Sequence, residues 1–82
     1  MSTIPLLVCD DSNMARKQLI RALPSNWPFV ISQATNGLEG VEAVRQGLGK
    51  IVLLDLTMPE LDGFGVLAKL REEGLQADVI VV

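Results

Sequence analysis

The sequence contains no histidine, no tyrosine and a single cysteine among its 82 residues. Without histidine the chain has no imidazole base, no imidazole metal ligand and no phosphohistidine. The one cysteine, Cys9, cannot form a disulfide within the chain, which favours a reducing compartment. Because Cys9 lies inside an apolar run, we expect a buried thiol that packs as a small hydrophobic side chain.

Long apolar runs are also missing. No stretch approaches the roughly 20 residues of a membrane-spanning helix, and the N-terminus lacks the basic segment and apolar run of a signal peptide. We therefore expect a cytoplasmic chain without membrane contact. The net charge is −3 and the charges are interspersed, so direct nucleic-acid contact is not indicated. Hydrophobic residues make up 49% of the chain, which indicates a folded domain, and the length allows one domain.

Short apolar runs alternate with segments of helical periodicity. The apolar runs predict strands over residues 4–9, 29–35, 51–54 and 79–82. The helical segments lie between them, over residues 14–23, 38–48 and 64–73. This order, with its short connections, predicts an α/β fold built on a parallel sheet with right-handed crossovers.

Local signals set the expected ends of these helices. Pro24 ends the first helix, Asn36-Gly37 is expected to form a turn before the second, and Gly74 suits the position after the third. In the first helix we expect Arg16 and Lys17 to fall between apolar positions. In the third, one apolar side is expected to contain Phe64, Leu67, Ala68 and Leu70.

Three aspartates follow two of the predicted strands. Asp10 and Asp11 come directly after the first strand, and Asp55 follows the apolar strand 51–54. The carboxyl ends of parallel strands meet at one edge of the sheet, where open α/β sheets bind ligands. Three carboxylates there repel one another unless a cation or protons intervene. The residues therefore indicate an acidic pocket suited to Mg²⁺, in which Asp11 and Asp55 are direct ligands and Asp10 holds a bound water. Asp55 is placed as a carboxylate nucleophile that would form an aspartyl phosphate.

The same residues resemble those of a known family, the CheY-like receiver domains of two-component response regulators. The stretch from Asp55 to Gly63 has the form D-x-x-M-P-x-x-D-G, and it follows the acidic pair Asp10-Asp11 at a fitting distance. Asn36-Gly37 and Arg16-Lys17 also look usual for this family. The resemblance covers the whole chain.

The resemblance implies a flavodoxin-like fold with strand order 2-1-3-4-5. It implies that Mg²⁺ is bound by Asp11, Asp55 and the backbone carbonyl of Thr57, with Asp10 acting through water. It implies phosphoryl transfer from a sensor histidine kinase, or a phosphotransfer protein, to Asp55. The chain would then be a phosphoacceptor with at most self-catalysed phosphotransfer, not an enzyme with a separate substrate. It also implies a structural loop that contains Met58, Pro59, Asp62 and Gly63.

Compared with the family pattern, the 82 residues end after the fourth strand. They are expected to form the N-terminal part of a single receiver domain (residues 1–82), without the fourth helix, fifth strand and fifth helix. The family's switch Ser or Thr and its lysine would follow Val82, so we expect impaired switching. The uncovered strand 79–82 predicts a homodimer or larger assembly.

The residues bear on three other functions. A haloacid-dehalogenase-type phosphatase needs a second acid two residues after its nucleophile, where this chain has Thr57. Residues 63–68 match the dinucleotide-binding pattern G-x-G-x-x-A, but they do not follow a strand directly. The third alternative is an assembly fragment with half of a flavodoxin-like fold and no phosphorylation at all.

Overall fold

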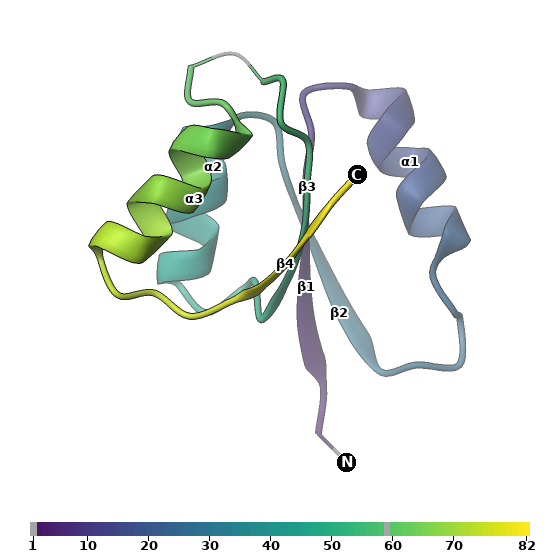
Figure 1. Ribbon diagram of the computed structural model, residues 1–82. Coiled ribbons are helices and arrows are strands. Elements are labelled where there is room, and N and C mark those ends of the chain that lie inside the picture. Colours follow the sequence, from purple (N-terminus) through teal and green to yellow (C-terminus); the bar gives the residue numbers. More distant parts are fainter. Residues whose placement is uncertain (1, 59) are drawn as a thin grey trace.

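The computed structural model describes residues 2–58 and 60–82, which form a parallel sheet with helices on both faces (Figure 1). The elements alternate along the chain in the predicted order. They are β1 (Ile4–Cys9), α1 (Asn13–Ala22), β2 (Phe29–Ala34), α2 (Gly37–Arg45), β3 (Ile51–Leu54), α3 (Gly63–Glu72) and β4 (Asp78–Val81).

The sheet has the order β2-β1-β3-β4, and each neighbouring pair is parallel. Cys9 at the end of β1 pairs with Ala34 of β2 and with Leu54 of β3, so these three strands end side by side. The helices α2 and α3 cover one face of the sheet and α1 covers the other (Figure 1). The predicted flavodoxin-like architecture, with β2 at an edge, is confirmed for these seven elements.

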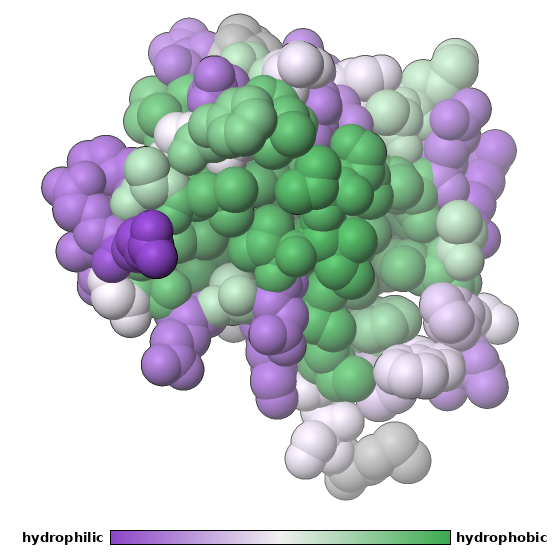
Figure 2. Space-filling view, viewed as in Figure 1, coloured by the Kyte–Doolittle hydropathy of each residue, from purple (hydrophilic) through white to green (hydrophobic). Residues whose placement is uncertain are grey.

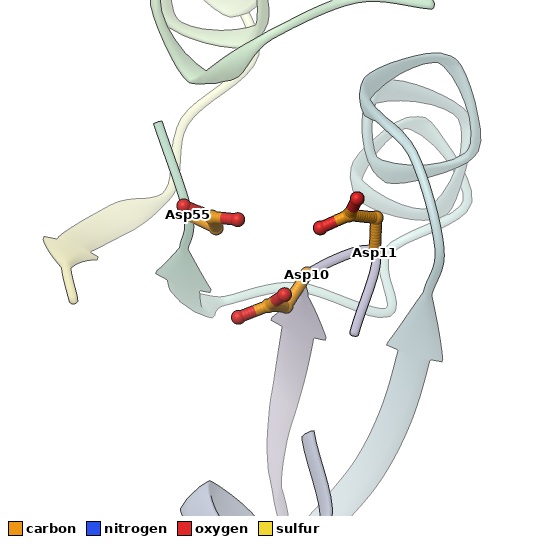
Figure 3. Close-up of side chains that lie close together, drawn as sticks. All are labelled: Asp10, Asp11 and Asp55. Atoms are coloured by element: carbon orange, nitrogen blue, oxygen red, sulfur yellow. The ribbon is translucent and has the colours of Figure 1, made fainter. Parts of the chain in front are cut away.

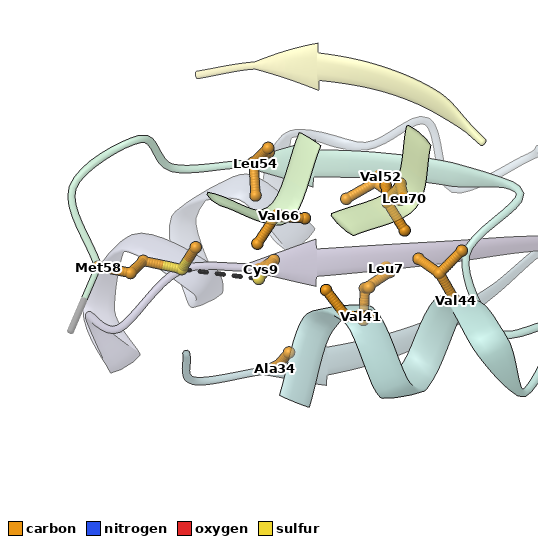
Figure 4. Packing of buried hydrophobic residues seen from close by; sticks show 10 residues of the cluster. All are labelled: Leu7, Cys9, Ala34, Val41, Val44, Val52, Leu54, Met58, Val66 and Leu70. Atoms are coloured by element: carbon orange, nitrogen blue, oxygen red, sulfur yellow. Dashed lines mark hydrogen bonds between the residues drawn. The ribbon is translucent and has the colours of Figure 1, made fainter. Parts of the chain in front are cut away.

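Most of the core lies between the sheet and the pair α2 and α3 (Figure 4). The side chains of this cluster are buried and almost all aliphatic, which is the pattern that strands covered on both faces require. Its members are Leu7, Cys9, Ala34, Val41, Val44, Val52, Leu54, Met58, Val66 and Leu70. The α1 face has a smaller cluster, in which only Leu6, Val8 and Leu53 are buried among the described residues.

All three helices start one residue earlier than predicted. Asn36 and Gly37 do not form a separate turn: Asn36 is the N-cap of α2, its side chain accepts a hydrogen bond from the amide of Glu39, and Gly37 is the first helical residue. An N-cap amide satisfies a helix donor that would otherwise lack a partner, which explains why the helix starts there. Gly47 and Gly74 follow α2 and α3 with positive φ angles of 84° and 68°, as expected for C-terminal glycines.

The prediction for the apolar side of α3 was partly wrong. Leu70 is buried, but Phe64 is 66% exposed, and Val66 takes the central position at 1% exposed. The buried face of α3 is set by Gly63, Val66 and Leu70, which lie three and four residues apart on one side of the helix. None of the helices in residues 2–58 and 60–82 has the length and apolar character that a bilayer crossing requires.

Candidate functional site: three aspartates at the ends of neighbouring strands

The three aspartates meet at the carboxyl ends of β1 and β3. One carboxylate oxygen from each of Asp10, Asp11 and Asp55 lies within 4.8 Å of the other two. The register explains this proximity, because Asp10 and Asp55 directly follow the paired residues Cys9 and Leu54. Figure 3 shows the carboxylates of Asp11 and Asp55 pointing toward each other from opposite sides of a gap, with Asp10 beside it.

Asp10 is held firmly by the backbone around it. Its side chain is buried and accepts a hydrogen bond from the amide of Ser12 at 2.9 Å, and its own amide donates to the carbonyl of Ala34 at 3.1 Å. In addition, Nη1 of Arg16 donates a hydrogen bond to the backbone carbonyl of Asp10 at 2.7 Å. Asp11, the next residue, is exposed. Asp10 is thus the buried member of the acidic cluster and Asp11 the exposed one.

Asp55 is half-buried and is oriented by the loop that follows it. Its amide donates to the carbonyl of Cys9 at 3.0 Å, which extends the β1–β3 pairing by one residue. Its Oδ1 accepts hydrogen bonds from both the amide and the hydroxyl of Thr57, each at 3.1 Å. Among the described residues, none donates a hydrogen bond to the second oxygen, Oδ2. One oxygen of Asp55 is therefore engaged by the protein and the other is available to a ligand.

The donor set fits a hard divalent cation. Mg²⁺ binds oxygen ligands at about 2.1 Å, so two oxygens on opposite sides of the ion lie about 4.2 Å apart. A spacing within 4.8 Å for all three carboxylates is close to that requirement. Two carboxylates with several waters is also the usual protein contribution to a Mg²⁺ site. Asp11 and Asp55 suit direct binding because they are the more accessible members, and buried Asp10 suits an outer-sphere role.

The negative charge of the pocket affects the neighbouring thiol. Cys9 is fully buried, and its single S–H hydrogen has two acceptors within reach, the carbonyl of Asn36 and Met58 Sδ, each 3.6 Å from Sγ. Figure 4 shows the contact with Met58. Burial, followed by the charges of Asp10, Glu39 and Asp55, raises the pKa of Cys9 from 9.0 to about 11. Cys9 therefore stays a neutral thiol near pH 7, in line with a packing role.

The loop after Asp55 is fixed at both ends. Met58 is 7% exposed and lies in the main core, while Asp62 caps α3 by accepting a hydrogen bond from the amide of Gly65 at 2.8 Å. A Cβ at Gly63 would lie 2.7 Å from the carbonyl oxygen of Asp55 and 2.6 Å from the Cα of Leu56, so only glycine fits. Pro59, also assigned to this structural loop, lies outside the described residues.

Arg16 is the residue of this region that sequence reasoning missed. It was expected between the apolar positions of the first helix, yet it is 7% exposed and contacts the backbone of Asp10. A signal was present: a positive charge in the first turn of a helix opposes the helix dipole, so a favourable interaction elsewhere is needed to offset it. Periodicity alone could not reveal that interaction, because the acceptors in Asp10 and Gln33 lie outside the helix.

Comparison with known proteins agrees with this geometry. Residues 6–82 match the family model described as response regulator receiver domain. The chain is 41% identical to protein-glutamate methylesterase/protein-glutamine glutaminase 5 of Myxococcus xanthus, over 100% of this chain and 24% of that protein. It is 32% identical to the chemotaxis protein CheY of Bacillus subtilis, over 93% of this chain and 63% of that protein.

Solved structures show the same relationship. The signal receiver domain of the putative response regulator NarL from Mycobacterium tuberculosis is 29% identical, with a TM-score of 0.87 over 99% of this chain and 66% of that one. The 82 residues thus span less than two thirds of the length of the two relatives named above. The Gly63–Ala68 pattern falls within α3, and close packing accounts for Gly63 and Gly65. By the extent of the match, its fold and its strand-end acidic pocket, the chain belongs to the response regulator receiver domain family.

Proposed function

We propose that Asp55 is the phosphoacceptor of this receiver domain and that the reaction depends on Mg²⁺. The observation that carries the proposal is the convergence of Asp10, Asp11 and Asp55 to within 4.8 Å at the sheet edge of a receiver-family chain. Under this proposal Asp11, Asp55 and the backbone carbonyl of Thr57 bind the cation, and Asp10 holds one of its waters. Bound Mg²⁺ would supply positive charge that offsets the carboxylates and the phosphoryl oxygens.

The free oxygen of Asp55 defines the chemical step. Because no described residue donates to Oδ2, Oδ2 is the oxygen that would attack phosphorus, and the cation would then be held through Oδ1. A new P–O bond forms to Asp55, and the bond from phosphorus to the donor breaks, leaving the imidazole of a kinase or the acetate of acetyl phosphate. The chain's own residues orient the nucleophile and hold the pocket, and the phosphoryl donor brings the leaving group. The domain is then a phosphoacceptor, not an enzyme with a separate substrate.

The test uses wild type and Asp55→Asn, which removes the charge and keeps the shape. Incubation with acetyl phosphate and Mg²⁺ should add one phosphoryl group to wild type, seen by intact mass, and none to the variant. Beryllofluoride with Mg²⁺ should shift the amide resonances around Asp55 in wild type alone. Equal labelling of both proteins, or a wild type that acetyl phosphate does not label and beryllofluoride does not perturb, contradicts the proposal.

Membership of the family supports a proposal for the partner and the setting. We propose that a sensor histidine kinase or a phosphotransfer protein in the cytoplasm supplies the phosphoryl group, and that residues 1–82 are the N-terminal part of a single receiver domain. We expect the 82 residues alone to switch poorly, because the hydroxyl residue and lysine implied by the resemblance would come after the fourth strand. A chain extended through a fifth strand should respond more strongly to phosphorylation than the 82 residues alone. An equal response would contradict that expectation.

The edge strand β4 supports a second proposal, homo-oligomerisation. Ile80, Val81 and Val82 are 52%, 51% and 53% exposed, and β4 pairs with β3 on one side only. Figure 2 shows a broad apolar area across the same face. A second copy that covers β4 would bury this surface and pair its backbone groups.

Sedimentation should show a dimer or larger species at tens of micromolar, and Ile80→Lys should shift it toward monomer. A stable monomer of wild type contradicts this proposal.

The same surface also fits an alternative function, assembly without phosphorylation. The two functions make different demands on the acidic pocket. If association is the function, neither Mg²⁺ nor beryllofluoride should perturb wild type, and Asp55→Asn should assemble as wild type does. If phosphoacceptance is the function, both reagents should act through Asp55.

A further inference from the structure

Arg16 is a buried cation beside the acidic pocket. Among the described residues, Arg16 and Asp10 are the two charged side chains that are buried, at 7% and 8% exposed. Arg16 belongs to the first turn of α1, where the helix dipole disfavours positive charge. Burying a guanidinium also costs free energy unless its donors are satisfied. Its position therefore reflects contacts that outweigh both costs.

Three nitrogens of Arg16 connect three separate parts of the chain. Nη1 donates to the carbonyl of Asp10 at 2.7 Å, Nε donates to Gln33 Oε1 at 2.9 Å, and Nη2 donates to Asn13 Oδ1 at 3.0 Å. These acceptors lie after β1, in β2 and in the first turn of α1. The rigid fork of the guanidinium suits such a three-way connection better than a lysine ammonium would.

None of these three acceptors carries a charge. Within residues 2–58 and 60–82, ion pairs shorter than 4.0 Å join Arg45 to Glu42 and Glu73, and Arg16 is in none of them. The hydrogen bonds of Arg16 thus hold one backbone carbonyl and two side-chain amides in place. Asp10 is the most restrained of the three acceptor residues, because its amide, carbonyl and carboxylate are all hydrogen-bonded.

Asp11 depends on this arrangement, because it follows Asp10 directly. The carbonyl that Arg16 binds belongs to the peptide group joining Asp10 to Asp11. The torsion angles on either side of that peptide group set the direction of the Asp11 side chain, and the bond from Arg16 restrains them. We propose that Arg16 is the positioning residue of the acidic pocket, which fixes the Asp10–Asp11 peptide so that the Asp11 carboxylate faces Asp55. This inference rests on the proposed Mg²⁺-dependent function.

Two effects of removing Arg16 have opposite signs, which makes the proposal testable. If its charge were all that mattered, removing a nearby cation would strengthen the attraction of the carboxylates for Mg²⁺. If positioning matters, removal should weaken Mg²⁺ binding. Loss of a supporting partner typically costs a metal site about 10-fold or more in affinity, so we expect weakening to prevail.

The experiment is a Mg²⁺ titration of the metal-free chain, followed by amide chemical shifts of the folded protein. Arg16→Met should bind Mg²⁺ about 10-fold more weakly than wild type. Arg16→Lys should be weakened similarly although it keeps the charge, because one ammonium cannot serve all three acceptors. Lys17→Met is the matched control: it removes one positive charge from the neighbouring exposed position and should bind as wild type or slightly more tightly.

A milder variant decides the question if Arg16→Met does not fold. Gln33→Ala removes one acceptor at an exposed position and should weaken Mg²⁺ binding a few-fold. A purely structural role for Arg16 would lower the melting temperature and leave the affinity of the folded chain unchanged. Wild-type or tighter affinity in Arg16→Lys and Gln33→Ala overturns the inference while leaving the proposed function intact. Failure of wild type itself to bind Mg²⁺ overturns the proposed function, and the inference with it.

Discussion

Thr57 binds a single oxygen of Asp55 with both its amide and its hydroxyl, at 3.1 Å each. The pair forms a small closed turn directly after β3, and it sets which carboxylate oxygen faces the pocket. The backbone half of this contact is available to any non-proline residue, whereas the hydroxyl half depends on Thr57 itself. The two halves can therefore be separated by substitution.

Thr57→Val keeps the shape of the side chain and removes the hydroxyl donor. A hydrogen bond of this kind contributes about 1 kcal/mol, so we expect Mg²⁺ affinity to fall by up to about fivefold as Asp55 gains rotational freedom. Calorimetric titration with Mg²⁺ measures the change. Thr57→Ser retains the hydroxyl and should stay near wild type. Equal affinities for Val and Ser would show that the amide alone orients Asp55.

Asp55→Asn should stabilise the metal-free chain, because it removes one of three clustered negative charges. Two like charges about 4 Å apart repel by about 1 kcal/mol in a water-like environment, so we expect a gain of that order in the free energy of unfolding. Denaturant unfolding with a chelator present measures it. Mg²⁺ should raise the melting temperature of wild type more than that of the variant.

Asp78→Asn is the control for that charge effect. Asp78 is exposed at the start of β4, whereas the pocket lies beyond the ends of β1 and β3. The substitution makes the same change in net charge without touching the cluster, so its stability should match wild type. A lower metal-free stability for Asp55→Asn would argue against repulsion within the pocket.

Gly63→Ala should damage the site through the backbone. The added Cβ would meet the Asp55 carbonyl oxygen and the Leu56 Cα, both main-chain atoms that cannot move aside independently. We expect a loss of about 2 kcal/mol or more in stability, as for other overpacked positions, together with weaker Mg²⁺ binding. Gly65→Ala is the comparison: its Cβ meets the flexible end of Leu61, so the loss should be smaller. Equal losses would mean that helix propensity or relaxation decides both.

Cys9 should react very slowly with thiol reagents in the folded chain. It is fully buried, and its pKa of about 11 leaves little of the reactive thiolate at pH 8. Because the raised pKa favours the protonated folded state, its contribution to stability is complete below about pH 9 and is lost as the pH rises toward 11. Reaction with a chromogenic disulfide should follow global unfolding in a denaturant series. Fast labelling under native conditions would indicate local opening of β1.

Much of the fold could be predicted because each strand is a short apolar run next to a clear helix signal. Residues 51–54 are apolar at every position, and β3 occupies these four residues. The meeting of three aspartates could also be predicted, because parallel strands end at a common edge. Which face of each helix is buried was harder: Phe64 and Val66 differ little in hydrophobicity, and packing against α2 and the sheet decides between them.

Hydrogen-bond partners of the pocket were beyond the reach of sequence reasoning. The contacts of Arg16 with Asp10 and Gln33 span 6 and 17 positions of the chain and depend on how α1 lies against the sheet. The Thr57–Asp55 contact is local, and the short separation of a hydroxyl residue from an aspartate is a recognisable turn signal. The common edge of parallel strands brings Asp10 and Asp55 together whatever covers the sheet, whereas the contacts of Arg16 depend on how one helix lies against it.

Burial is unequal on the two faces of the sheet, and α1 covers the face with fewer buried side chains. On that face the apolar residues of α1 itself are only partly buried, and Arg16 is its one buried member. Elements with few buried apolar contacts open first in native-state fluctuations. Fraying of α1 would loosen the segment that carries Asp11 while leaving Asp55 anchored on β3. A cation bound by both Asp11 and Asp55 would link the start of α1 to the end of β3. Amide exchange in α1 should therefore slow when the cation is bound.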